Sequence, residues 1–125
     1  MPTTKALLSR PEQLLYARLV RAFPGHVILA HVALSRWLMA NFVVYRPDFT
    51  AVAAVELDEP VDKSSDAQRC AMRHKHRRKD LQLQAAGLKV VRLAGHDLPD
   101  ERALKSLVAA LPLIPPSAQV MRHAS

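Results

Sequence analysis

The stretch from Phe49 to Asp58, FTAVAAVELD, constrains the fold more than any other part of the chain. Between residues 51 and 57 it is apolar at every position except Glu56, so both alternating faces of a strand would be apolar. A strand of this kind needs cover on both sides, which places it inside a sheet with helices on its two faces. The sequence therefore predicts an α/β domain built around this strand.

Short signals at the ends of elements divide the rest of the chain. Ser9 and Glu12 have the spacing of a capping box, which predicts the start of a helix. Residues 46–48, Arg-Pro-Asp, predict a turn, and Gly87 predicts the end of a second helix. The predicted elements are a helix over 10–23, strands over 26–34, 41–45 and 49–58, a helix over 65–86, a strand over 88–93 and a helix over 100–111, with a short connection over 35–40.

This order gives a helix, a three-strand meander, a helix, a strand and a helix, with a mixed sheet flanked by helices. The third strand, the second helix and the fourth strand form a crossover, so these two strands should be parallel. Residues 1–112 are predicted to form one domain, which is long enough for its own core. Residues 113–125 are rich in Pro and are predicted to be a tail.

The chain is expected to be cytoplasmic. Its single Cys70 cannot form an internal disulfide, and residues 1–15 lack the apolar core and cleavage site of a signal peptide. The most apolar stretch, residues 26–45, carries Arg36 near its centre, which disfavours insertion into a bilayer. No membrane partner is therefore predicted.

Most of the net charge of +7 lies in one segment. Residues 63–80 hold seven Lys or Arg and only two Asp. A helix face in water is one interpretation, and a surface that binds phosphates is the other, because clustered cations release counterions from a nucleic-acid backbone. DNA is the expected partner and RNA the second. The candidate nucleic-acid-binding residues are Arg73, Lys75, Arg77, Arg78 and Lys79.

Two carboxylates end the central strand. Glu56 and Asp58 lie two residues apart, so they share a face with Cα atoms about 6.5 Å apart. A hairpin turn at residues 46–48 would bring Asn41 beside them. Carboxylate and amide oxygens suit Mg²⁺, which could polarise a phosphodiester and activate water. The alternative is that both acids are exposed at the strand end and pair with Lys or Arg of the second helix.

The segments NFVVYRPDFTAVAAVELDEP and KHRRKDLQLQAAGLKVVRL resemble a bacterial family named domain of unknown function 2726. This family is related to the very-short-patch-repair-like nucleases, within the restriction-endonuclease-like PD-(D/E)XK group. The resemblance covers roughly residues 7 to 94 and implies a restriction-endonuclease-like core. The positions that match the family are Glu12, Asn41, Glu56, Asp58, Lys79 and Arg92.

The resemblance implies a catalytic site of Glu12, Asn41, Glu56, Asp58 and Lys79. Glu56, Asp58 and Asn41 would hold Mg²⁺ or Mn²⁺, and Lys79 would help to activate water or stabilise charge. The implied activity is metal-dependent hydrolysis of DNA. Asn41 stands where the family has Asp, and an amide brings no charge, so metal affinity and activity are expected to be weakened or lost.

Other features leave alternatives open. Glu-Pro at residues 59–60 replaces the rest of the acidic motif, and His76 stands where the family helix has Asp. The capping box alone also accounts for Glu12. A binding module that keeps the basic helix at 63–80 without hydrolysis is the second hypothesis, and a protein-interaction domain, suggested by Trp37 and the Pro-rich tail, is the third.

The second helix has two lines of residues that could face the sheet. The resemblance favours the line that contains Lys79. The first line is Ala67, Cys70, Ala71, His74, Arg78, Leu81 and Ala85, and the second is Met72, His76, Lys79, Leu83 and Ala86.

Overall fold

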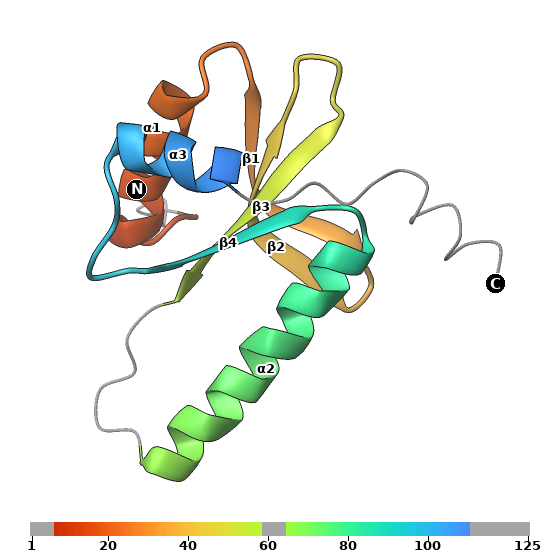
Figure 1. Ribbon diagram of the computed structural model, residues 1–125, viewed down its shortest axis with the longest axis vertical. Helices are drawn as coiled ribbons and strands as arrows, with labels where there is room; N and C mark the ends of the chain where they lie inside the picture. The colour runs from red at the N-terminus through yellow and green to blue at the C-terminus, as the bar shows by residue number, and fades with distance from the viewer. Residues whose placement is uncertain (1–6, 59–64, 111–125) are drawn as a thin grey trace, which may run out of the picture.

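The fold is α/β, with one mixed sheet of four strands and three helices, as Figure 1 shows. The computed structural model describes residues 7–58 and 65–110. Its elements follow the predicted order of helix, three strands, helix, strand and helix. They are α1 (Arg10–Ala22), β1 (Val27–Ser35), β2 (Leu38–Tyr45), β3 (Ala51–Asp58), α2 (Asp66–Ala85), β4 (Lys89–Ala94) and α3 (Glu101–Ala110).

The strands lie in the order β1-β2-β3-β4, so β3 is an inner strand. β1 and β2 are antiparallel, as are β2 and β3, and the crossover through α2 makes β3 and β4 parallel. From Ala53 to Leu57 every residue of β3 is buried. The prediction of a central strand covered on both faces is confirmed.

Helices cover the two faces of the sheet unequally. α1 and α3 pack against one face, where Leu15, Leu19 and Leu104 join the larger apolar core. α2 crosses the other face, where Leu83 joins a smaller core with Val43 and other residues. In Figure 1 the N-terminal end of α2 projects away from the sheet. Every residue from Ser65 to Lys75 is exposed, so the first half of α2 makes little contact with the body.

An irregular residue in β1 changes which face of the sheet the side chains occupy. His31 has a left-handed backbone with φ of 53°. Before it, Ala30 packs on the face of α1, whereas after it Val32 packs on the face of α2. β2 changes faces in the same way at Asn41. Ala40 and Phe42 are two residues apart and would share a face in a regular strand, but Phe42 lies on the α1 face and Ala40 on the α2 face.

Local signals in the sequence predicted most element ends correctly. The Ser9 and Glu12 side chains form the expected capping box at the start of α1. The turn after β2 is closed by a hydrogen bond from the backbone N–H of Phe49 to the carbonyl oxygen of Arg46, at 2.8 Å. Gly87, with φ of 91°, follows α2 in the backbone conformation that favours glycine.

The predicted connection over residues 35–40 is wrong. β1 and β2 are joined by a turn of only two residues, Arg36 and Trp37, and β2 begins at Leu38 rather than at Asn41. Tight two-residue turns usually contain Gly, Asn or Asp, and Arg-Trp gives no such signal. The β1–β2 hairpin is therefore longer than predicted, and Trp37 lies at its tip.

Some predictions fall outside the described residues: the Pro-rich tail over 113–125, Glu-Pro at 59–60, and the start of the basic segment at Lys63. Among the helices that the structure describes, none combines the length and the apolar character that crossing a membrane requires.

Candidate functional site

The predicted acids, Glu56 and Asp58, lie at the end of β3, beyond its last backbone pair with β2. The backbones of the two strands pair from Tyr45 and Ala51 to Phe42 and Val55, and side chains bridge the next residues. The backbone N–H of Asn41 donates to Oε2 of Glu56 at 2.6 Å. In return, the backbone N–H of Leu57 donates to Oδ1 of Asn41 at 3.0 Å. Asn41 and Glu56 are thus adjacent, as the predicted hairpin requires, and together they join the two strand ends.

Glu56 is fully buried and forms an ion pair with α2. Its side chain is 0% exposed, and Oε1 contacts the ammonium group of Lys79, which is 31% exposed. A buried carboxylate without a partner would be strongly destabilising, so Lys79 anchors α2 to the sheet through charge. The line of α2 residues that contains Lys79 and Leu83 therefore faces the sheet, as the resemblance favoured.

Asp58 belongs to a second group of charges. Arg92 of β4, which lies opposite Glu56 in the parallel ladder, contacts both Asp58 and Asp80 of α2 at 2.5 Å. Burial disfavours the charged guanidinium, but the hydrogen bonds that Arg92 donates to Asp80 and Asp58 outweigh it and raise the pKa of Arg92. Nδ1 of His76 lies 3.5 Å from the other oxygen of Asp58.

These contacts modify the predicted pairing of the two acids. Glu56 does pair with a lysine of the second helix, but it is completely buried rather than exposed. Asp58 pairs with Arg92 of the fourth strand rather than with a Lys or Arg of the helix. The role of Asp80 could not be predicted, because its partner Arg92 lies twelve residues away on another element.

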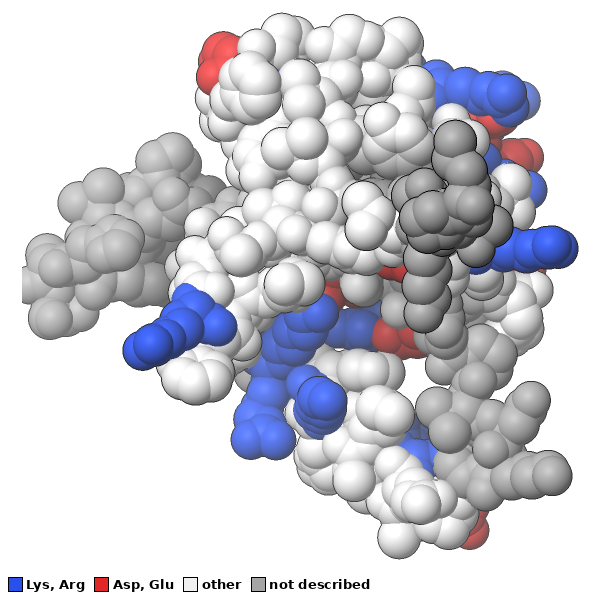
Figure 2. Space-filling view, turned by 180° about the vertical axis from the view of Figure 1, so that it is seen from behind, with Lys and Arg blue, Asp and Glu red and all other residues white. Residues whose placement is uncertain are grey.

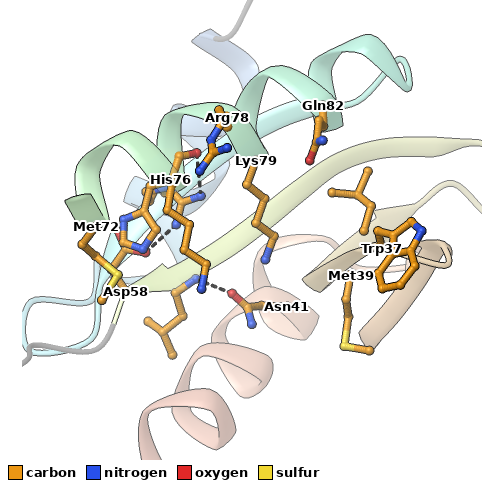
Figure 3. A pocket seen from close by; sticks show the side chains of 13 residues that line it. Trp37, Met39, Asn41, Asp58, Met72, His76, Arg78, Lys79 and Gln82 are labelled. Carbon is orange, nitrogen blue, oxygen red and sulfur yellow. Dashed lines mark hydrogen bonds and ion pairs between the residues drawn. The ribbon is translucent and has the colours of Figure 1, made fainter. Parts of the chain in front are cut away.

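A groove runs past this group, between α2 and the β1–β2 hairpin (Figure 3). Its volume is about 560 Å³. Trp37 and Met39 lie at one end, and Asp58, Met72 and His76 at the other (Figure 3). The basic residues of α2 that line it are Lys75, Arg78 and Lys79.

The five predicted nucleic-acid-binding residues lie on two sides of α2. Lys75, Arg78 and Lys79 line the groove. Arg73 and Arg77 each lie two positions from Lys75, about 200° around the helix, and therefore point to its other side. Arg73, Lys75, Arg77 and Arg78 are all exposed, and none of them forms an ion pair with a residue that the structure describes.

Glu12 is held by the cap of α1 and by β1. It accepts the backbone N–H of Ser9 at 2.9 Å and pairs with Nε2 of His31 at 2.7 Å. Burial raises the pKa of a carboxyl group, but here the hydrogen bonds from Ser9 and His31 outweigh it and hold the pKa of Glu12 below its usual 4.5. The capping role that the sequence offered as an alternative is present, with His31 as an unexpected partner.

The arrangement of the predicted metal ligands does not fit a divalent cation. The Glu56 oxygens contact the Asn41 N–H and Lys79, and the Asp58 oxygens contact Arg92 and His76. Mg²⁺ needs several oxygen ligands at about 2.0–2.1 Å, and the two cations already on the acids would repel it. Within residues 7–58 and 65–110, no group of three or more His, Cys, Asp or Glu side chains is placed to hold a metal ion.

A scan against protein-family models finds no match for this chain, and searches of curated proteins and of solved structures find none. The resemblance to the family of unknown function 2726, and with it the restriction-endonuclease-like core, stays a prediction. Within the chain itself, the geometry brings Asn41, Glu56, Asp58 and Lys79 together beside a basic groove.

Proposed function

We propose that this chain is a nucleic-acid-binding module that holds the phosphate backbone along α2 and the adjoining groove. The observation that carries the proposal is the set of exposed, unpaired cations on the described part of α2, two of which, Lys75 and Arg78, line the groove. Figure 2 shows Lys and Arg side chains gathered around a hollow in the surface.

The spacing of these cations argues against a helix face that is merely solvated. Arg73 and Arg77 lie four residues apart, and Lys75 and Arg78 lie three apart, so like charges are neighbours on the helix surface. Such pairs destabilise a helix by about 0.2–0.5 kcal/mol each, and a solvated face usually alternates Glu with Lys. An anion bound along α2 would relieve this repulsion.

The acids at the groove do not cancel the positive charge of its wall. Glu56 and Asp58 are each paired with a cation of this chain, so they present little free negative charge to a ligand. Lys75 and Arg78 face the groove without a carboxylate partner among the described residues. A polyanion is the ligand that this charge distribution favours.

Two double substitutions with the same change in net charge test the proposal. Lys75→Glu with Arg78→Glu reverses the groove side of α2, and Arg73→Glu with Arg77→Glu reverses its other side. Anisotropy of a labelled DNA oligonucleotide, titrated from about 50 to 200 mM salt, should show steep salt dependence for the native chain. The groove pair should lose most of the affinity and lower the salt slope by about one per side chain.

The control pair should retain more affinity than the groove pair. Native protein that fails to bind DNA or RNA at low salt would refute the proposal, and so would affinity that is unchanged in both double variants. Equal losses in the two variants would show that the charge of the whole helix, rather than the groove, holds the ligand. The circular dichroism of each variant should match that of the native chain.

Hydrolysis of DNA is the activity that the resemblance implies, and the convergence of Asn41, Glu56, Asp58 and Lys79 is what favours it. Because the oxygens of the acids are engaged by this chain, we expect no cleavage by the native protein with Mg²⁺ or Mn²⁺. Asn41→Asp adds the carboxylate that the family has. Cleavage by the native chain or by Asn41→Asp that Glu56→Ala abolishes would establish the nuclease hypothesis instead.

A further inference from the structure

Trp37 lies almost wholly in water at the tip of the β1–β2 hairpin. It is 88% exposed, and it is the only Trp of the chain. The tip has a defined geometry: the backbone N–H of Trp37 donates to Oγ of Ser35 at 3.3 Å, and the guanidinium of Arg36 lies 5.8 Å from the ring centroid. An indole held in water forgoes the large stabilisation that its burial provides, and nothing in the packing of the fold requires it there.

The ring stands at one end of the groove described above. In Figure 3, Trp37 and Met39 lie opposite the α2 side chains Lys79 and Gln82. An aromatic ring and a row of cations along one groove are the two parts with which proteins bind single-stranded nucleic acids. The cations follow the phosphates, and a base stacks on the ring.

The exposed ring favours a single strand over a duplex. The groove volume of about 560 Å³ is within the roughly 300–1,000 Å³ of small-ligand sites, so the groove can take a nucleotide. In a duplex the faces of the bases are stacked on one another and cannot reach Trp37. Only a strand with an unstacked base can use the ring and the cations together.

The groove does not suit an apolar protein partner. A partner that covered Trp37 and filled the groove would also cover Lys75 and Arg78, and removing these charges from water without anionic partners is unfavourable. A nucleotide offers both an apolar face for the ring and a phosphate for the cations. We propose that Trp37 stacks on an unpaired base of a single-stranded nucleic acid whose backbone lies along Lys75 and Arg78. The proposal rests on the proposed function and narrows its ligand to single strands.

Because Trp37 is the only Trp, fluorescence excited at a wavelength that the two Tyr do not absorb reports this position alone. An oligothymidylate of about 15 nucleotides, within the range of site sizes of single-strand-binding domains, should quench it, and a duplex of equal length should quench it much less. An oligouridylate titrated in parallel shows whether a ribose strand stacks as well.

Affinities of the variants are measured by anisotropy of the labelled oligonucleotides. Trp37→Ala should lower affinity for the single strand roughly five- to hundredfold, with duplex affinity unchanged. Trp37→Phe should restore most of the loss, because it keeps an aromatic face. Phe49→Ala is the matched control, since Phe49 is 64% exposed at the other turn, between β2 and β3, and does not line the groove.

The outcomes separate this proposal from the one on which it rests. Equal affinity for single strand and duplex, with no quenching and no effect of Trp37→Ala, would overturn the stacking proposal. If Lys75→Glu with Arg78→Glu still abolished binding in that case, the proposed function would stand. Absence of binding to any nucleic acid at low salt would overturn both. A peptide-like partner would be indicated if Trp37 were quenched by protein ligands and not by oligonucleotides, which also contradicts the proposal.

Discussion

The helices α1 and α2 begin in the same way and are held to the sheet in opposite ways. Both start with a complete capping box, formed by Ser9 with Glu12 in α1 and by Ser65 with Gln68 in α2. α1 buries three side chains over 13 residues. α2 buries only Leu83 over 20 residues. Two ion pairs attach it to the sheet, one between Lys79 and Glu56 and one between Asp80 and Arg92.

This difference indicates what each helix is for. α1 contributes to the apolar core and stabilises the domain. α2 contributes little apolar area for its length, and its first half projects with exposed cations. Most helical stability in proteins comes from packing an apolar face, so a long helix that lacks one has to be retained for another reason. Binding of a polyanion along α2 is the reason that we propose.

The largest expected effects come from removing one leucine from each helix. Leu19→Ala leaves a cavity in the larger core and should lower the free energy of unfolding by about 2–5 kcal/mol, measured by urea denaturation. Leu83→Ala removes the only buried side chain of α2, so α2 should detach from the sheet before the rest of the domain unfolds. Hydrogen exchange should show lost protection in α2 with β3 still protected. Equal loss of protection in α2 and β3 would contradict the weak apolar attachment of α2.

Lys79→Met tests the ionic attachment of α2. The variant leaves Glu56 buried without a cation, which should lower the free energy of unfolding at neutral pH by about 2 kcal/mol. The effect is smaller than the roughly 3–5 kcal/mol of fully buried pairs, because Lys79 is 31% exposed. The double variant with Glu56→Gln removes both charges and should recover most of the loss. Urea denaturation that finds no recovery would show that Lys79 acts through packing.

The two capping boxes allow a direct comparison of the helices. Ser9→Ala should lower the free energy of unfolding by about 1 kcal/mol, because α1 is part of the core. Ser65→Ala removes the same kind of cap from a helix end that is exposed, so it should mainly fray the first turn of α2. The global change should then be below about 0.5 kcal/mol. Thermal denaturation of the two variants measures the difference, and equal shifts would be inconsistent with a weakly attached α2.

The smallest expected effect depends on pH. The pKa of Glu12 is lower in the folded chain than its usual 4.5, so the ionised carboxylate stabilises α1 above that pH. This contribution is lost as the pH falls through the lowered pKa. The advantage of the native chain over Glu12→Gln should therefore be present near pH 7 and shrink below about pH 4.5. Gln68, the equivalent residue of α2, does not titrate, and Gln68→Ala should show no such pH dependence between pH 3 and 7.

The fold class, the order of elements and the pairing of β3 with β4 follow from local patterns in the sequence. The apolar run of β3, the capping box at Ser9 and the glycine after α2 each act within a few residues. The turn at Arg36 and Trp37 could not be predicted, because neither residue favours a tight turn. Nor could the left-handed backbone of His31, or its contact with Glu12, nineteen residues away.

The candidate site could be predicted in part. Residues two apart on a strand share a face, which placed Glu56 beside Asp58, and the hairpin placed Asn41 next to them. The partners of the acids depend on how α2 is rotated against the sheet, and two lines of residues on α2 left that rotation open. Arg92 and Asp80 meet only after α2 and β4 have packed together, so no local pattern reports their contact.

Among the described strands, β1 lies at one edge of the sheet. A regular edge strand presents a row of backbone N–H and C=O groups on which a second molecule can add a strand, which is a route to aggregation. The left-handed backbone at His31 interrupts this row in the middle of β1. The residue that pairs with the cap of α1 therefore also makes the edge of the sheet a poor template for association between copies of the chain.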